Sequence, residues 1–312
     1  MNQTMKAVGI ASYDGPNAAM IGDFLRPAPG PGEVLVRVHA CGVNPLDWKV
    51  CDGSVAAFLS SSPPFIIGAD VAGVVEAVGE GVTRFVVGDA VFGQVGLLGG
   101  FAEYAVTAQN RLSKKPAKLS FAEAACIPVS GSTAHDLLFK DGQLQPGERV
   151  FVQAGAGGVG HYVVQLAKDA GAYVIATCSA GSAEFVRGLG ADEVVDYHAG
   201  PFEQAVRDID LAIDTVGDTI LTRTWAVLKP AGRMNTSVPP TVPLTHGDRT
   251  AIFSVGKPDD DGANLDRLGQ LAAEGRAKPR LQQVFAFADV VDALELSKAG
   301  HVHGKIALQL ID

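Results

Sequence analysis

Residues 149–168, RVFVQAGAGGVGHYVVQLAK, decide the fold of this chain. They open with Val150–Val152, an apolar run rich in β-branched and aromatic residues, which predicts a strand buried on both faces. Gly155, Gly157 and Gly160 follow with the spacing G-x-G-x-x-G, and apolar residues then recur with helical periodicity. The order of strand, tight glycine turn and helix predicts a dinucleotide-binding site.

Each glycine has a physical task in such a turn. Gly155 is expected to let the backbone turn sharply out of the strand, Gly157 to leave room for a pyrophosphate, and Gly160 to let the helix pack closely on the strand. Gly158 and Val159 complete the turn, ahead of a helix N-terminus whose free N–H groups attract phosphates. The alternative is a tight turn that holds no ligand.

One other phosphate-binding loop is excluded. A P-loop needs Lys followed by Ser or Thr where this chain has His161 and Tyr162. The turn is therefore expected to bind a dinucleotide rather than a nucleoside triphosphate.

The second strand indicates which dinucleotide is bound. Residues 173–177 end in Cys178-Ser179, and no carboxylate occurs between Asp169 and Glu184. An NAD site would place an acid about 20 residues beyond the glycines, where it would also repel a 2′-phosphate, so NADP(H) is favoured. The candidate donors for that phosphate are Ser179, Ser182 and Tyr197, together with Arg187, for which a solvated surface role is an equal alternative.

Composition sets the broad class of the protein. The chain has 312 residues, of which 47% are hydrophobic and 19% are charged, which predicts two folded domains. A net charge of −9 argues against nucleic-acid binding, and no signal peptide or membrane span is evident. Four scattered cysteines without metal spacing fit a reducing cytoplasm.

The pattern of predicted elements changes near residue 126. Residues 1 to about 125 show short strands that end in glycine turns, which suggests a small barrel-like domain. Strands and helices then alternate as in a parallel sheet covered by helices. In this second region strands are expected at 149–153, 173–177, 193–196, 211–214 and 232–236, and helices at 158–170, 183–189, 202–207 and 219–228. Two helices, 265–274 and 290–299, precede a last strand at 305–310, which is expected to return to the first domain.

Nine segments spread over nearly the whole chain resemble the medium-chain dehydrogenase/reductase superfamily, and within it the zinc-independent quinone oxidoreductase branch, which includes zeta-crystallin-like and enone oxidoreductase proteins. The segments are the glycine turn and CGVNPLDWK (41–49), PFIIGADVAG (64–73), VGDAVFG (87–93), GFAEY (100–104), GSTA (131–134), LGAD (189–192), DTVG (214–217) and HGK (303–305). The resemblance implies an α/β fold with a GroES-like β-barrel catalytic domain, 1–125 with 257–312. A Rossmann domain with a doubly wound parallel sheet, 126–256, would bind NADP(H).

The zinc-dependent alcohol dehydrogenases of this superfamily offer a contrast. Their catalytic zinc uses a Cys that aligns with Asn44 and a His that aligns with Ala69, and neither replacement binds zinc strongly. The cysteines of their structural zinc are also missing between Phe92 and Gly100. We therefore expect no metal, and Cys41, beside the former ligand position, is interpreted as a core residue.

The loss of zinc limits the reaction. Without a Lewis acid the hydride acceptor must itself be electrophilic, as a quinone or an α,β-unsaturated carbonyl is. The resemblance implies that Asn44, Asp47 and Lys49 face the nicotinamide: Asn44 would bond the acceptor or the ribose, and Lys49 would neutralise developing charge. An Asp47–Lys49 ion pair that orders the loop is an equal alternative.

Further coenzyme contacts are implied at two positions. Thr133 resembles the family threonine near the nicotinamide, with a helix cap as its alternative role. Val216, in the DTVG motif, is expected to contact the coenzyme as well. Asp70 is expected to fix a turn rather than to act as a base.

The sequence thus predicts an NADPH-dependent quinone oxidoreductase in the cytoplasm. The alternatives are reduction of an enone or 2-alkenal double bond on the same scaffold, and a non-catalytic, crystallin-like NADPH-binding protein. Partners other than the small-molecule substrate are limited to a second copy of the chain. That homodimer would join the Rossmann sheets edge to edge, through residues 234–238 or 251–255.

Overall fold

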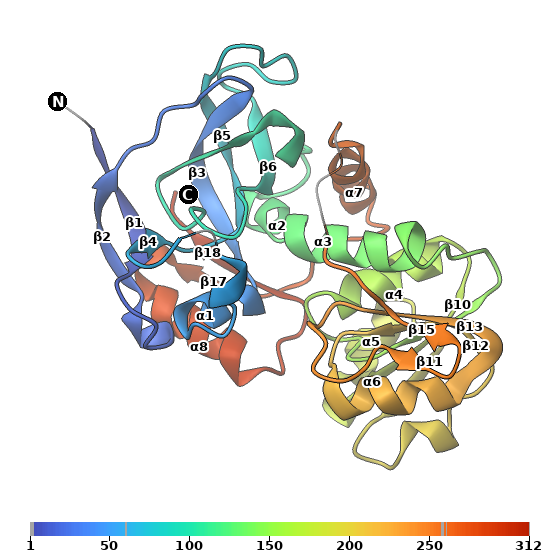
Figure 1. The fold of residues 1–312 in the computed structure, drawn as a ribbon. Coiled ribbons are helices and arrows are strands. Elements are labelled where there is room, and N and C mark those ends of the chain that lie inside the picture. The colour runs from blue at the N-terminus through green and yellow to red at the C-terminus, as the bar shows by residue number, and fades with distance from the viewer. Residues whose placement is uncertain (1–2, 60, 257–258, 260, 312) are drawn as a thin grey trace. The chain divides into compact units, whose positions relative to one another are not determined.

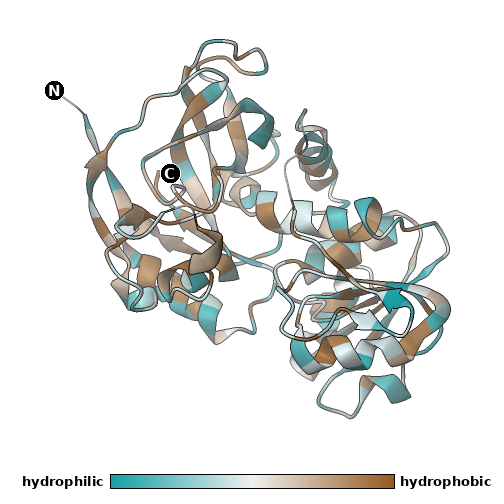
Figure 2. Cartoon of the chain, in the orientation of Figure 1, coloured by the Kyte–Doolittle hydropathy of each residue, from teal (hydrophilic) through white to brown (hydrophobic). Residues whose placement is uncertain are grey.

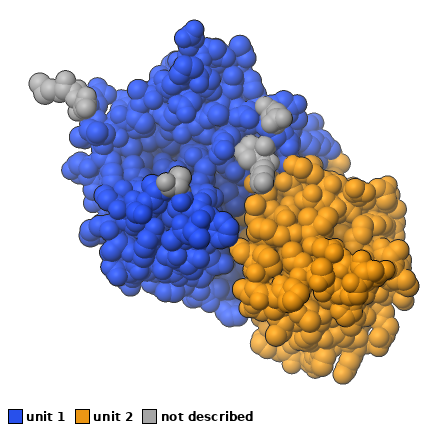
Figure 3. All heavy atoms as spheres, viewed as in Figure 1, with its two compact units in different colours: residues 1–129, 258–273, 279–312 blue, residues 130–257, 274–278 orange. Residues whose placement is uncertain are grey.

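The structure, a computed structural model, describes residues 3–59, 61–256, 259 and 261–311. The chain forms two compact units, shown in Figure 3. Unit 1 comprises Met1–Val129, Pro258–Ala273 and Pro279–Asp312, and unit 2 comprises Ser130–Lys257 and Glu274–Lys278. The domain bounds expected at residues 1, 257 and 312 lie outside the described residues.

Unit 2 is built on a six-stranded parallel sheet. Its spatial order is β11-β10-β9-β12-β13-β16, with strands β9 (Arg149–Val152), β10 (Tyr173–Cys178), β11 (Glu193–Asp196), β12 (Ile209–Asp214), β13 (Leu228–Thr236) and β16 (Ile252–Phe253). From β9 the chain adds β10 and β11 on one side of the sheet, and it then returns to add β12, β13 and β16 on the other side. Right-handed crossovers therefore place helices on opposite faces, and the predicted doubly wound sheet is confirmed.

Four helices and a small hairpin complete unit 2. They are α3 (Pro128–His135), which begins two residues before the unit and runs on as a π-helical turn to Lys140, α4 (Gly160–Asp169), α5 (Ala183–Gly188), α6 (Asp218–Thr224) and the hairpin of β14 (Thr245–His246) and β15 (Arg249–Thr250). Helix α6 is amphipathic: Leu221 is buried and Arg223 is exposed, and Figure 2 shows both hydropathies along it. The helix predicted at 202–207 is wrong. Only a 3₁₀ turn, Phe202–Gln204, forms there, and Asp208, at φ 58°, has a left-handed backbone that prevents any helix from continuing beyond residue 207.

Unit 1 contains two sheets (Figure 1). The larger has the order β17-β18-β3-β5-β6-β8, with β7 also paired to β3, and the smaller has the order β2-β1-β4. The strands are β1 (Thr4–Ile10), β2 (Met20–Leu25), β3 (Glu33–Val43), β4 (Phe65–Ile66), β5 (Asp70–Val78), β6 (Ala90–Gln94), β7 (Tyr104–Ala108), β8 (Leu112–Lys114), β17 (Leu281–Ala286) and β18 (Lys305–Gln309). Helices α1 (Pro45–Cys51), α2 (Phe121–Ala125), α7 (Ala263–Ala273) and α8 (Val290–Ala299) accompany them.

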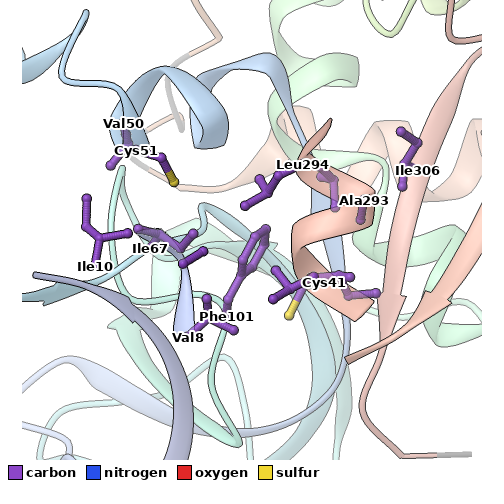
Figure 4. Close-up of a cluster of buried hydrophobic side chains, with 14 of the residues drawn as sticks. Val8, Ile10, Cys41, Val50, Cys51, Ile67, Phe101, Ala293, Leu294 and Ile306 are labelled. Atoms are coloured by element: carbon purple, nitrogen blue, oxygen red, sulfur yellow. The ribbon is translucent and has the colours of Figure 1, made fainter. Parts of the chain in front are cut away.

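The last strand returns to the first part of the chain, as predicted. β18 pairs antiparallel with β3, with Ile306 opposite Val43. This pairing brings residues from the two ends of unit 1 into one hydrophobic core, in which Phe101 lies among Ile67, Cys41 and Leu294 (Figure 4). The interpretation of Cys41 as a core residue is confirmed.

Candidate functional site

The glycine turn joins β9 to α4 at the carboxyl end of the sheet. Two hydrogen bonds tie it to the neighbouring strand β10: Gly155 N donates to Thr177 O (2.8 Å), and Ala154 N donates to Thr177 Oγ1 (3.0 Å). The turn is thus held by the sheet itself, and α4 begins directly after it. In doubly wound sheets ligands bind at this edge, where the strand order reverses.

The structural roles of the glycines differ from those predicted. The left-handed residue that turns the chain out of β9 is Ala154 (φ 51°), not Gly155. A Cβ on Gly155 would instead lie 2.8 Å from Ala176 Cβ, so Gly155 permits close packing on β10. A Cβ on Gly160 would lie 2.1 Å from Ala154 O, which excludes any side chain. A Cβ on Gly157 would meet only Ala154 O, at 3.3 Å, so the fold alone hardly requires this glycine.

His161 holds the turn from within the helix. Its ring is fully buried, and Nδ1 lies 3.0 Å from Gly157 O. The sequence predicts no structural role for His161, which there only excludes a P-loop. The feature that indicates such a role is a histidine on an otherwise apolar face of the helix.

A buried amide supports the turn from below. Gln153, the residue after β9, accepts a hydrogen bond from Thr177 Oγ1 (2.9 Å) and donates one to Thr224 Oγ1 (3.2 Å). Because Thr177 Oγ1 also binds Ala154 N, the strand ends and the turn form one hydrogen-bonded unit. Such a unit fixes the turn's backbone before any ligand arrives.

Asp214 organises the next loop in the same way. It is fully buried, and its carboxylate accepts hydrogen bonds from Val216 N (3.0 Å), Gly217 N (3.0 Å) and Thr236 Oγ1 (2.8 Å). The loop it holds presents Val216, which is 45% exposed. The predicted coenzyme contact therefore lies on a loop fixed by a buried carboxylate.

The candidate phosphate donors gather at the ends of β10 and β11. Ser179 Oγ lies 2.9 Å from Ser182 Oγ, and Tyr197, 42% exposed, donates its N–H to Cys178 O (3.2 Å). Burial raises the pKa of Cys178, and the positive charge of Arg187 opposes that shift. The exposed guanidinium of Arg187 therefore lies near the end of β10 as well.

Thr133 lies inside α3, as the sixth residue of that helix. The alternative role of a helix cap is therefore wrong, because the helix begins at Pro128. The Thr133 hydroxyl accepts a hydrogen bond from Gly256 N (3.0 Å), and a Cβ on Gly256 would lie 2.3 Å from Thr133 N. Thr133 thus fixes a chain segment that passes close to the helix.

In unit 1, two of the three predicted catalytic residues meet. Asn44 precedes α1, and its backbone N–H donates to Asp47 Oδ2 (2.7 Å). Lys49 lies outside this pair, with its ammonium 5.5 Å from the ring centroid of Trp48. Among the residues that the structure describes, Asp47 and Lys49 form no ion pair, because residues two apart on a helix point in different directions. That alternative is wrong.

Two further residues complete what we call the buried polar cluster: Asn44, Asp47, Asp70 and Lys305. Asn44 Nδ2 donates to Asp70 Oδ2 (2.9 Å), and Lys305 Nζ donates to Asn44 Oδ1 (2.5 Å). All four side chains are at most 2% exposed. The HGK motif contains the signal for Lys305, a charged residue at the head of an apolar strand, but its partners could not be read from the sequence.

Asp70 does more than fix a turn. Its Oδ1 accepts a hydrogen bond from Val129 N (3.0 Å) near the start of α3, and its Oδ2 binds Asn44. Burial raises its pKa to about 6, against the opposing effects of Lys305 and these hydrogen bonds. Burial likewise raises the pKa of Asp47 to about 7, with the nearby Asp70 adding to the shift and the Asn44 bond opposing it. Both carboxyls therefore hold a proton to higher pH than exposed aspartates do.

These shifts predict how stability depends on pH. The pKa of Asp47 is higher in the folded protein than in the unfolded one. Protonation of Asp47 therefore stabilises the fold fully below pH 3.8, the ordinary pKa of an aspartate, and this contribution is lost as the pH rises to about 7. The difference in unfolding free energy between wild type and Asp47→Asn should fall by about 1.4 kcal/mol per pH unit across that window. Urea unfolding at several pH values measures it.

A control has the opposite sign. Hydrogen bonds from Val86 N and Lys114 lower the pKa of Asp89, so its contribution is present above pH 3.8 and is lost only at more acid pH. The difference in unfolding free energy between wild type and Asp89→Asn should therefore not change between pH 4 and 7. If the difference for Asp47→Asn also stayed constant over this pH range, the assignment of a raised pKa to Asp47 would be contradicted.

Within the described ranges, no group of three or more His, Cys, Asp or Glu residues is placed to hold a metal ion. No helix of the part of the chain that the structure describes is long and apolar enough to cross a membrane.

Comparison with known families and proteins gives consistent matches. Residues 30–117 match the alcohol dehydrogenase GroES-like domain, and residues 189–308 match the zinc-binding dehydrogenase family. The chloroplastic quinone-oxidoreductase QR1 of Triphysaria versicolor is 33% identical, over 98% of each chain. The mitochondrial NAD(P)H oxidoreductase RTN4IP1 of Danio rerio is 32% identical, over 90% of this chain and 84% of its own.

A solved structure agrees with them. The quinone oxidoreductase of Coxiella burnetii has a TM-score of 0.91 at 32% identity, and the match covers 99% of this chain and 100% of that one. The predicted fold class, a GroES-like domain with a Rossmann sheet, is confirmed. The chain belongs to the medium-chain dehydrogenase/reductase superfamily and, within it, to the quinone oxidoreductase branch.

Proposed function

We propose that this oxidoreductase reduces a quinone with a hydride from NADPH and does so without a metal. The observation that carries the proposal is the glycine turn after β9, where Gly157 leaves space that the fold itself does not use. The names of the relatives, which include quinone and NAD(P)H oxidoreductases, support a nicotinamide coenzyme and a quinone acceptor. In this proposal unit 2 binds the coenzyme and unit 1 supplies Asn44, Asp47 and Lys49.

The preference for NADPH rests on the end of β10. Ser179 and Ser182 stand where an NAD site would have an acid, and the charge of Arg187 is nearby. One carboxylate, Asp196 at the end of β11, lies opposite Cys178, and it accepts the N–H of His198. Hydroxyl groups and a guanidinium can bind a phosphate, so NADPH should be preferred.

The proposal that no metal takes part rests on the side chains at the two zinc-ligand positions. Asn44 and Ala69, at the positions of the zinc ligands in zinc-dependent relatives, offer an amide and a methyl group, and the Asn44 amide is bonded to Asp70 and Lys305. When bound, the coenzyme supplies the hydride. The protein must then hold the acceptor close to it and exclude water, and an acceptor that is already electrophilic needs no Lewis acid.

Reduction of a conjugated double bond is the second candidate. A 2-methylene-furan-3-one reductase of Solanum lycopersicum is 34% identical, over 89% of this chain and 72% of its own. The same scaffold and hydride would serve an enone or a 2-alkenal, because in both cases conjugation stabilises the product anion.

A single assay separates these functions. The purified protein is incubated with NADPH or NADH and with 1,4-benzoquinone, 9,10-phenanthrenequinone, a 2-alkenal or an alcohol, and the loss of nicotinamide absorbance is followed. We expect turnover of quinones, at least about tenfold higher kcat/KM with NADPH than with NADH, and no change when a chelator is added.

The other outcomes identify the alternatives. Turnover of 2-alkenals but not of quinones would favour the double-bond reductase. Tight NADPH binding with no turnover of any acceptor would indicate a non-catalytic binding protein. Turnover of alcohols on addition of zinc would contradict the metal-free proposal.

The assembly and compartment stay predictions. Of the two segments expected to join a homodimer, 234–238 begins in β13, which lies inside the sheet, whereas 251–255 contains the edge strand β16. Ile252 and Phe253 of that strand are exposed, so we propose β16 as the edge that meets a second copy. The cytoplasm remains the expected compartment, although the relatives named above include chloroplastic and mitochondrial proteins.

A further inference from the structure

Helix α4 carries two buried polar residues on one face, four positions apart. His161 is fully buried and Gln165 is 5% exposed. Residues at this spacing lie one above the other along a helix, so the two side chains follow each other from the glycine turn toward the middle of α4. Buried polar groups are costly unless they are hydrogen-bonded, and the bonds of this pair lead to a distant segment of the chain.

Gln165 uses its side-chain amide to hold segment 274–278. Its Oε1 accepts the N–H of Lys278 (3.1 Å), and its Nε2 donates to Lys278 O (3.1 Å) and to His161 O (2.9 Å). The amide thus pairs with the Lys278 backbone through two bonds, as one strand pairs with the next. The neighbouring Ala277 is 1% exposed, so this part of the segment is packed within unit 2.

An ion pair holds the same segment at the end of the helix. Arg276 donates to both carboxylate oxygens of Asp169 (2.6 and 2.9 Å), and it also donates to Glu274 (3.0 Å). Arg276 and Asp169 are exposed, so dissolved salt screens their attraction. The Gln165 amide, which is shielded from water, is therefore the less salt-sensitive of the two contacts.

His161 extends the contact to the glycine turn. Gly157 O accepts hydrogen bonds from the backbone N–H of His161 (3.0 Å) and from its ring Nδ1 (3.0 Å), and Nδ1 must carry a proton because a carbonyl cannot donate one. The peptide between Gly157 and Gly158 is trans, so its N–H points opposite to its C=O. His161 therefore aims the Gly158 N–H away from itself, and no group of the described residues accepts that N–H.

Segment 274–278 leads to a part of the chain that carries predicted site residues. It joins α7 to β17, and both of these elements belong to unit 1. Just before β17, Arg280 O accepts the N–H of Lys305 (2.8 Å), and the Lys305 ammonium binds Asn44. Whatever holds the segment on α4 therefore also restrains the chain that continues toward Asn44.

We propose that His161 and Gln165 are positioning residues that couple the coenzyme turn to segment 274–278. When the segment is docked, the Gln165 amide binds Lys278 and His161, and the His161 ring fixes the peptide that offers its N–H to the pyrophosphate. NADPH binding and docking of the segment then strengthen each other by the same factor, because such coupling is reciprocal. The inference rests on the proposed function, since it needs a coenzyme at the glycine turn.

Hydrogen exchange of the wild type measures this coupling without any substitution. The N–H of Lys278 exchanges with solvent when the segment leaves α4 and its bond to Gln165 opens. We expect saturating NADPH to slow the exchange of this N–H by about fivefold or more. Unchanged exchange of Lys278 in a protein that binds NADPH would overturn the inference.

Gln165→Met keeps the length of the side chain and removes its three hydrogen bonds. We expect it to weaken NADPH binding by about fivefold in a fluorescence titration, and to abolish the effect of NADPH on the exchange of Lys278. A merely structural role of Gln165 would not make these two factors agree. Wild-type affinity, or retained protection of Lys278 by NADPH, in folded Gln165→Met would contradict the coupling.

His161 is tested by a conservative pair of substitutions. The amide of Asn can place a donor near the position of Nδ1, whereas Leu offers none. We expect His161→Leu to weaken NADPH binding by about tenfold and to abolish the protection of Lys278, and His161→Asn to restore most of both. Equal losses in the two variants would rule out the contribution of Nδ1.

Lys168→Met is the matched control on the same helix. The Lys168 ammonium binds Asp192 (2.6 Å), at a distance from the segment in the hydrogen-bond network, so NADPH affinity and the exchange of Lys278 should both be those of wild type. Failure of the coupling and failure of the proposed function remain distinguishable. A wild type that binds neither NADPH nor NADH overturns the proposed function, whereas one that binds NADPH without protecting Lys278 overturns only the coupling.

Discussion

Gly157→Ala should weaken NADPH binding at least tenfold and leave the stability of the protein within about 1 kcal/mol of wild type. The new Cβ would meet Ala154 O at 3.3 Å, a contact that a shift of a few tenths of an ångström relieves. On its open side, however, the methyl group would hold the pyrophosphate away from the turn. Tenfold corresponds to about 1.4 kcal/mol of binding free energy.

Gly160→Ala is the matched variant in the same turn. Its Cβ would lie 2.1 Å from Ala154 O and 3.0 Å from Gly155 Cα, so the backbone of the turn itself must move. We expect a loss of about 3 kcal/mol or more in unfolding free energy. Urea unfolding and fluorescence titration with NADPH measure both quantities. Wild-type affinity in Gly157→Ala would show that the turn does not bind the coenzyme.

The sequence predicts unit 2 well because its signals are local. The apolar run of β9, the glycine spacing and the helical periodicity of α4 are contiguous, and parallel strands buried on both faces are apolar throughout. Edge strands are harder to predict. The sequence does not predict β2 or β17, since most of their side chains are exposed and neither shows a clear apolar alternation.

The buried polar cluster lay beyond the reach of the sequence for a different reason. Asn44 and Lys305 are separated by 261 positions, and only the pairing of β18 with β3 brings them together. Asp47 and Lys49 are close in sequence, yet the helix turns them apart, so proximity along the chain suggested the wrong partner. Motif position identified Asn44 and Asp47, but only the fold identifies what holds them.

Asp214→Ala should destabilise the protein by about 3–5 kcal/mol and weaken coenzyme binding in whatever fraction still folds. The carboxylate is fully buried and accepts hydrogen bonds from Val216 N, Gly217 N and Thr236 Oγ1. Alanine leaves these donors without an acceptor, and each buried donor without a partner costs about 1–3 kcal/mol. The loop that presents Val216 would lose its fixed conformation, so the coenzyme would have to order it on binding.

Asp210→Ala, in the same strand, is the control for this prediction. Asp210 is only partly buried, and its carboxylate binds Lys229 (2.7 Å) and Arg149 N (2.9 Å) near the surface. Its loss should cost about 1 kcal/mol, as exposed ion pairs and single hydrogen bonds do, and should leave NADPH affinity unchanged. Urea unfolding and NADPH titration of both variants provide the comparison. Equal destabilisation by the two substitutions would contradict the claim that the buried hydrogen bonds of Asp214 fix the loop.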